Sequence, residues 1–227
     1  MMKRYAILLL ILFISVPLFA SRSKQVDRLQ ESAIVLQEIM NIPEEGIPTD
    51  LLRKSECIII IPAMKKAAFG FGGNYGRGAM LCRLTDNNWS APVMVSITGG
   101  SFGLQIGGSS TDIVLLVMNK RGVDKLLESK FTIGGDATAA AGPKGRSAAA
   151  ATDAQMRAEM LCYARSRGVF AGISIQGSVL KPERNDNEDL YGKVVEPKAI
   201  IAGKVPVPGP AKKLVAELKQ YSEMAAK

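Results

Sequence analysis

The sequence contains no histidine among its 227 residues. Histidine is the side chain whose ordinary pKa lies closest to neutral pH, so its absence removes the usual general base of an enzyme. The same absence excludes serine–histidine–aspartate and cysteine–histidine catalysis and nearly every zinc-enzyme site. We therefore expect a binding protein rather than an enzyme, with no catalytic residue, no metal and no cofactor.

Cysteine is scarce: Cys57, Cys82 and Cys162 lie far apart and form no C-x-x-C pair. Without histidine, these three residues do not predict a metal site. The favoured interpretation is that all three are small, buried, apolar side chains. The alternative is that two of them pair in an oxidising compartment and leave the third free.

The sequence also lacks a phosphate-binding loop. In the glycine-rich stretch 70–78, Tyr75 occupies the position of the third glycine of G-x-G-x-x-G, and no G-x-x-x-x-G-K-[ST] run occurs. The stretch instead predicts a glycine-rich, aromatic-lined turn region of a sheet. Gly142–Gly145 match the short G-x-x-G loop of an RNA-binding fold, but this four-residue pattern is frequent by chance, and we expect no nucleic-acid partner.

The N-terminus has the pattern of a secretory signal peptide. Lys3 and Arg4 precede an apolar stretch over 5–18, and Ala20 fits the last residue before a cleavage site. The expected division is a signal peptide over 1–20 and a domain over 21–227, in the periplasm or outside the cell. An uncleaved membrane anchor is the alternative. Losing Lys3 and Arg4 would reduce the formal net charge from +8 to +6, which suits an anionic partner.

Hydrophobic residues make up 47% of the chain, enough to bury a core. Apolar residues recur at spacings of three and four in 22–42 and 212–226, which predicts amphipathic helices at both ends. Between them, Pro62 is expected to end a buried strand, and Gly99 and Gly100 to turn the chain. The predicted strands cover 57–61, 80–84, 89–98, 112–118, 159–166 and 169–180. The predicted fold class is α+β: a single domain with a glycine-rich, mainly antiparallel β core flanked by terminal amphipathic helices.

Several motifs, taken in order along the chain, resemble the SYLF domain family, over about residues 25–220. They are Tyr75-Gly76-Arg77-Gly78, Gly103-Leu104-Gln105-Ile106-Gly107-Gly108 with Thr111-Asp112, Ala141-Gly142-Pro143-Lys144-Gly145-Arg146, Gly168–Ser178 and Tyr191-Gly192. Within these and nearby segments, Asp112, Asp136 and Asp153 adjoin glycine or small polar residues, which predicts turn or capping roles rather than catalytic ones.

The SYLF resemblance implies lipid binding, chiefly to phosphoinositides in eukaryotic members, through an N-terminal amphipathic helix and basic residues. It also implies actin binding in some fungal relatives and no enzymatic activity. With the leader, it indicates a secreted bacterial member that meets anionic phospholipid. The candidate lipid contacts are Lys24, Arg28, Lys65, Lys66, Lys212 and Lys213. The alternative function is an envelope protein-interaction scaffold without lipid binding.

Overall fold

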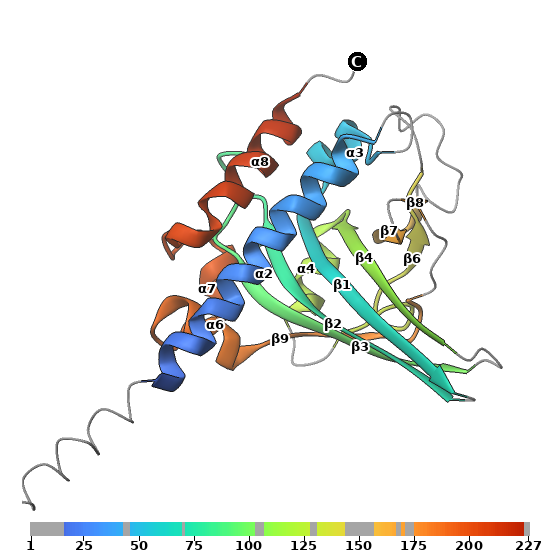
Figure 1. The fold of residues 1–227 in the computed structure, drawn as a ribbon. Coiled ribbons are helices and arrows are strands. Elements are labelled where there is room, and N and C mark those ends of the chain that lie inside the picture. The colour runs from blue at the N-terminus through green and yellow to red at the C-terminus, as the bar shows by residue number, and fades with distance from the viewer. Residues whose placement is uncertain are drawn as a thin grey trace, which may run out of the picture.

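The fold is a curved sheet with helices against it (Figure 1). The computed structural model describes residues 16–42, 46–69, 71–102, 107–127, 131–143, 157–166, 169–170 and 175–224. Helix α2 (Val16–Met40) and helix α8 (Lys212–Glu223) lie side by side across one face of the sheet. The α+β class, the single domain and the terminal helices are confirmed.

The sheet is centred on four long strands: β1 (Cys57–Phe69), β2 (Phe71–Cys82), β3 (Val93–Phe102) and β4 (Gly107–Val117). The shorter strands are β5 (Phe131–Thr132), β6 (Ala139–Ala141), β7 (Met160–Ser166), β8 (Val169–Phe170) and β9 (Val179–Pro182). The strand order is β5-β9-β3-β2-β1-β4-β7-β6, with β8 also paired to β7. Of the pairs that the structure describes, β6 with β7 is parallel and the others are antiparallel.

Helices α2 and α8 pack on one face of the sheet through the apolar residues whose spacing predicted these helices. Every third or fourth residue of α2 faces the strands, and Leu29, Ala33, Leu36 and Ile39 are each 0% exposed. In α8, the same pattern buries Leu214 and Leu218 in the same cluster. The apolar stripes of both terminal helices therefore lie against the β core.

The opposite face of the sheet is also covered, by helices α4 (Lys120–Leu126) and α7 (Pro197–Ile201). Successive strand residues point to opposite faces, so Ile58 and Ile60 face α2 while Ile59 and Ile61 face the second cluster. This explains the unbroken apolar run in β1. Among the described residues, the remaining helices are α3 (Thr49–Lys54), α6 (Arg184–Tyr191) and the 3-10 turn η2 (Gly209–Ala211).

Two predicted strand ends are wrong. Pro62 does not end β1; the strand passes through it at a β-bulge, where the register to both neighbouring strands shifts and Ala63 takes φ +47°. Gly99 and Gly100 do not turn the chain but continue β3 beside Asn74 and Gly73. The glycine-rich stretch before them is strand as well, from Phe71 onward. Pairing with neighbouring strands on both sides outweighs the local preference of proline and glycine for turns.

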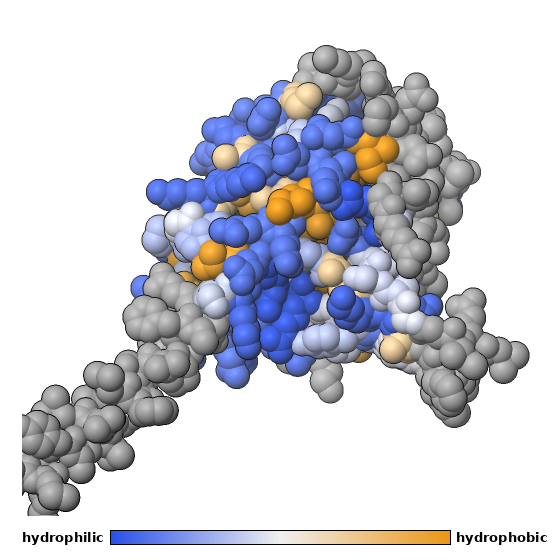
Figure 2. All heavy atoms as spheres, in the orientation of Figure 1, coloured by the Kyte–Doolittle hydropathy of each residue, from blue (hydrophilic) through white to orange (hydrophobic). Residues whose placement is uncertain are grey.

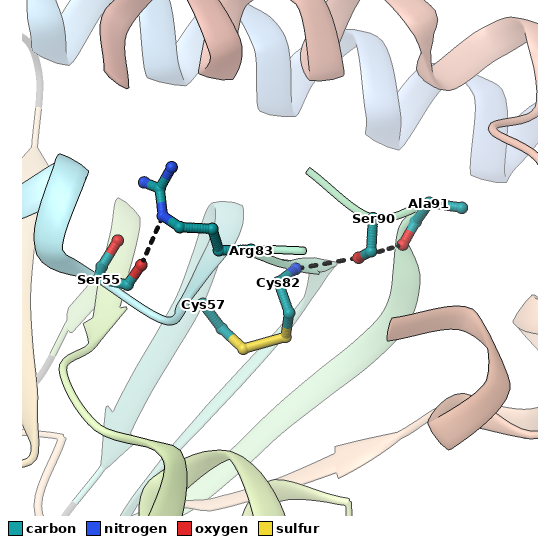
Figure 3. The surroundings of a disulfide bond; sticks show 6 residues. All are labelled: Ser55, Cys57, Cys82, Arg83, Ser90 and Ala91. Atoms are coloured by element: carbon teal, nitrogen blue, oxygen red, sulfur yellow. Dashed lines mark hydrogen bonds between the residues drawn. A yellow bond between two sulfur atoms is a disulfide. The ribbon is translucent and has the colours of Figure 1, made fainter. Parts of the chain in front are cut away.

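A disulfide joins Cys57 of β1 to Cys82 of β2, which are directly opposite each other in the register (Figure 3). It lies on the sheet face away from α2 and α8. Cys162 is free. The favoured prediction of three unpaired cysteines is therefore wrong, and the alternative of one pair and one free thiol is confirmed. The error arose because the antiparallel register, which brings residues 25 positions apart together, is not visible in the spacing alone.

Within the described residues, none of the helices is long and apolar enough to cross a membrane.

Candidate anion-binding site

The motif Tyr75-Gly76-Arg77-Gly78 lies in β2 where that strand approaches the bulge of β1. A Cβ on Gly78 would lie 1.9 Å from the carbonyl oxygen of Ile60. A Cβ on Gly76 would lie 2.5 Å from Cγ2 of Ile61. These two glycines are therefore required by close strand packing rather than by contact with a ligand.

Arg77 of the same motif belongs to a buried charge cluster around Asp186 of α6. Oδ2 of Asp186 accepts a hydrogen bond from Nη1 of Arg28 at 2.6 Å and lies 3.5 Å from Nη1 of Arg77. Nε2 of Gln25 donates to Oδ1 at 3.1 Å. The cluster joins α2, β2 and α6. The side chains of Arg28 and Asp186 are only 12% and 10% exposed, so the predicted lipid contact Arg28 is engaged inside the fold.

A second charged network fixes the bulge of β1. Oδ1 of Asp112 accepts the backbone N–H of Ala63 at 2.9 Å, and Oδ2 accepts from Arg165 at 2.8 Å. Arg165 also donates to Glu38 of α2. Asp112 therefore has a structural role, but inside β4 and not in the predicted turn or cap. The predicted turn role of Asp136 is confirmed, because Asp136 accepts the N–H of Thr132 in a turn. Asp153 lies outside the described residues.

The other motifs also have structural roles wherever the structure describes them. The hydroxyl of Tyr191 donates to the carbonyl of Pro92 at 2.7 Å, and Gly192 ends α6 with φ +68°. A Cβ on Gly142 would lie 2.1 Å from the ring of Tyr163. Lys144 and Gly145 of the G-x-x-G pattern lie outside the described residues. The described motif residues thus build the scaffold, and recognition must be sought among exposed side chains.

The structure does not gather the six candidate lipid contacts into one site. Lys24 is exposed on α2, whereas Lys212 and Lys213 are exposed at the start of α8. Lys213 has Glu217 as its ion partner at 3.8 Å. Lys65 and Lys66 lie on β1 beyond the bulge, at the end of the sheet that extends past the helices (Figure 1).

The outward face of α2 is a poor surface for an anion. Among its described exposed side chains, Lys24 is opposed by three carboxylates, Asp27, Glu31 and Glu38. Ile34, 46% exposed, is an isolated apolar residue there. Figure 2 shows a mostly hydrophilic face with small, separate hydrophobic patches. The charge on α2 therefore does not favour binding of this face to an anionic surface.

A hollow of about 750 Å³ lies beside Lys65 and Lys66. The strand register places Lys65 opposite Ser110 and Lys66 opposite Ser109, and Ser166 of β7 donates to the carbonyl of Ser110 at 3.4 Å. The lining also includes Ala67 and Gly108. Two lysines and three serines are among the residues that line the hollow, and no acidic residue is, which suits a phosphate group.

The charges of Lys65 and Lys66 are not neutralised within the described part of the chain, where neither forms an ion pair. By contrast, a hollow of about 370 Å³ at the start of α6 is lined by charges of both signs, among them Lys181, Glu183 and Arg184. The serines beside the lysines were not predicted, because they come from β4 and β7 and become neighbours only through the sheet. The described residues also contain no cluster of acidic or cysteine side chains that would hold a metal ion.

The comparison with known families decides the identity of the fold. A family profile described as "Ysc84: Las17-binding protein actin regulator" matches residues 98–221, more than half of the chain. The chain belongs to the Ysc84 family. The resemblance to the SYLF domain is thereby confirmed.

Relatives of this Ysc84 domain occur in fungi and mammals. The chain is 37% identical to the "SH3 domain-containing protein PJ696.02" of Schizosaccharomyces pombe over 74% of its own length and 40% of the relative. It is 32% identical to "Protein YSC84" of Saccharomyces cerevisiae, covering 86% of the chain and 42% of the relative. It is 30% identical to the human "SH3 domain-containing YSC84-like protein 1", covering 86% and 58%. The chain thus spans about two fifths to three fifths of these relatives.

Proposed function

We propose that this Ysc84 domain is an exported, non-catalytic binding module that attaches to anionic phospholipid surfaces through Lys65 and Lys66. The observation that carries the proposal is the hollow at the end of the sheet, which is lined by both lysines and by three serines. We define the distal sheet end as residues 64–69 of β1, 71–75 of β2, 98–102 of β3 and 107–111 of β4. Its sequence contains two lysines and no acidic residue.

The expected attachment is weak and reversible. A lysine close to an anionic membrane contributes about 1 kcal/mol, so Lys65 and Lys66 together contribute about 2 kcal/mol. The exposed Lys212 and Lys213 on α8 add to the general positive charge. These charges interact through solvent, so dissolved salt screens them. At about 0.1 M salt, charges more than about 10 Å apart hardly interact, and we therefore expect membrane binding to weaken as salt is added.

Export is supported by two independent features. Residues 1–20 have the signal-peptide pattern, and Cys57 and Cys82 are joined in a disulfide. Structural disulfides form and persist mainly in oxidising compartments, such as the periplasm and the extracellular space. The proposed location is therefore periplasmic or extracellular, with association to a membrane surface.

A protein partner is the second candidate, favoured by the names of the family and its relatives. The family description says "Las17-binding protein actin regulator", and one yeast relative is the "LAS seventeen-binding protein 3". In an exported protein, the equivalent role would be an envelope scaffold that binds another protein and no lipid.

Co-sedimentation with vesicles tests the proposal. The purified protein is expected to sediment with vesicles of phosphatidylglycerol and phosphatidylcholine, less so at high salt, and not with phosphatidylcholine alone. The double variant Lys65→Gln/Lys66→Gln should bind the anionic vesicles about 30-fold more weakly, corresponding to about 2 kcal/mol.

The matched control removes the same charge elsewhere, at the exposed Lys193 and Lys204, which follow α6 and α7. The variant Lys193→Gln/Lys204→Gln should retain nearly all binding. If both double variants lose the same vesicle affinity, net charge alone explains the binding, and the proposed site is contradicted. Absence of vesicle binding together with a stable cross-linked protein partner would support the scaffold instead.

A further inference from the structure

The start of helix α6 forms one wall of a second hollow, which the proposed lipid contact does not use. This α6 hollow has a volume of about 370 Å³, which is within the range of small-molecule sites. Four separate segments line it: Leu127 after α4, residues 181–182 of β9, residues 183–185 at the start of α6 and residues 196–197 at the start of α7. Figure 1 shows α6 and α7 far from the distal sheet end.

Two of the charges that line the α6 hollow neutralise each other. Lys181 and Glu183 form an ion pair at 3.4 Å, and Glu183 also accepts a hydrogen bond from the hydroxyl of Ser96. The carboxylate of Glu183 is thus held by two partners, and it makes no hydrogen bond to the first turn of α6. The N–H groups at the start of α6 are therefore not capped by the residue that precedes the helix, and such groups favour an anion.

The other two charges of the lining have no partner within the described part of the chain. Arg184 and Glu196 are both exposed, and they carry opposite charges. Neither side chain forms an ion pair or a hydrogen bond there, with the other or with any further group. Two opposite charges that share a hollow without contacting each other leave room between them for a ligand that carries both charges.

The rest of the lining suits the uncharged body of such a ligand. Leu127, Pro182 and Pro197 are apolar and half-buried. Asn185 adds an amide, which can both donate and accept hydrogen bonds. Apolar walls with a few polar groups that fix the orientation of the ligand are typical of sites for small organic molecules.

We propose that the α6 hollow binds an α-amino acid, or a short peptide with free ends, in its zwitterionic form. Arg184 and the uncapped N–H groups of α6 bind the carboxylate, because a guanidinium donates two parallel hydrogen bonds to such a group. Glu196 binds the ammonium, whose three N–H groups are donors. This proposal does not depend on lipid binding at Lys65 and Lys66.

Amide chemical shifts of the isotope-labelled full chain test the proposal. The probes are alanine, alanylalanine and alanyl-alanyl-alanine, which distinguish a free amino acid from a peptide as the ligand. At least one probe should shift the amide signals of Lys181, residues 183–185 and Glu196, and not those of Lys65 and Lys66. Acetylating the amino end or amidating the carboxyl end of that probe should weaken its binding about tenfold, because one charge-assisted contact is lost.

Two variants assign the two ends of the ligand. Arg184→Gln should weaken binding of the free-ended probe about tenfold and have little effect on the amidated probe. Glu196→Gln should weaken binding equally and have little effect on the acetylated probe. The matched controls are Arg121→Gln and Glu188→Gln, at exposed residues that do not line the hollow, and both should bind as the unchanged protein does.

The proposal is overturned if none of the three probes shifts the amides around the hollow, or if the control variants lose as much affinity as the other two. Circular dichroism checks that each variant folds. If one does not, the acetylated and amidated probes test the same contacts on the unchanged protein. A failure of this proposal would leave vesicle binding intact, because that binding rests on Lys65 and Lys66.

Discussion

Arg28 illustrates how a residue with the chemistry of a surface contact is used inside a fold. Its guanidinium bridges α2 to Asp186 of α6, at a position where both side chains are nearly buried. Arg77 approaches the same carboxylate from β2. The cluster thus fixes the position of α2 across the sheet by charge as well as by its apolar stripe.

The variant Asp186→Asn should lower the free energy of unfolding by about 3 kcal/mol, because it leaves the buried Arg28 without a counter-charge. Urea denaturation, followed by circular dichroism, measures the change. The matched control is Asp50→Asn, which removes an exposed ion pair with Arg53 at 2.5 Å and should cost less than about 1 kcal/mol. Equal effects of the two variants would show that the Asp186 cluster is not a buried pair in solution.

At the scale of elements, hydrophobic periodicity predicted the amphipathic helices, which pack against the sheet through a single apolar face. Helices α2 and α8 were predicted with ends within a few residues of those described, except that α2 begins at Val16. Helix α6 was not predicted, because residues 184–191 are mostly polar. Its position depends on tertiary contacts, such as the side chain of Asn187 bonding to the backbone of Met94.

The lysines of the candidate site could be predicted from the sequence, but its serines could not, because their position also depends on tertiary contacts. Lys65 and Lys66 are adjacent basic residues, and the sequence identifies them directly. Ser109, Ser110 and Ser166 are ordinary polar residues until β4 and β7 place them beside β1. Sheet register is a long-range property, and no local pattern determines it.

The disulfide between β1 and β2 makes a prediction at this scale. Replacing the pair, as Cys57→Ala/Cys82→Ala, should lower the free energy of unfolding by about 3 kcal/mol, because the unfolded chain loses a cross-link closing 25 residues. The measurement is thermal or urea unfolding of both proteins. Adding reductant should destabilise the unchanged protein towards the variant and leave the variant unaffected. A reductant-insensitive stability in the unchanged protein would contradict the pair.

At the scale of the whole molecule, the thiol of Cys162 and the phenols of Tyr163 and Tyr191 should make the protein less stable at alkaline pH. Burial raises the pKa of Tyr163 and Tyr191 above their usual 10.0, and raises the pKa of Cys162 from 9.0 to about 12. The unfolded chain therefore releases these protons first as the pH rises. With respect to these three groups, stability should be constant between about pH 7 and pH 9 and decline from there through pH 12, by about 1.4 kcal/mol per pH unit for each group that ionises only in the unfolded state.

Urea midpoints measured between pH 7 and pH 11 check this decline. The double variant Tyr163→Phe/Tyr191→Phe starts less stable, because it loses hydrogen bonds to the carbonyls of Pro143 and Pro92. Its loss between pH 9 and pH 11 should nevertheless be smaller. A profile as steep as that of the unchanged protein would assign the alkaline loss to other groups.

The bulge at Ala63 divides one strand into two parts with separate duties. Before it, β1 is covered on both faces and tolerates little change. After it, Met64 is still fully buried, whereas Lys65 and Ala67 are exposed and Lys66 is half-buried. Changes at residues 65–67 can therefore redirect the module to another target without endangering its folding. This segment of β1 is therefore suited to protein engineering: a grafted segment of different chemistry would give the same framework a new binding specificity.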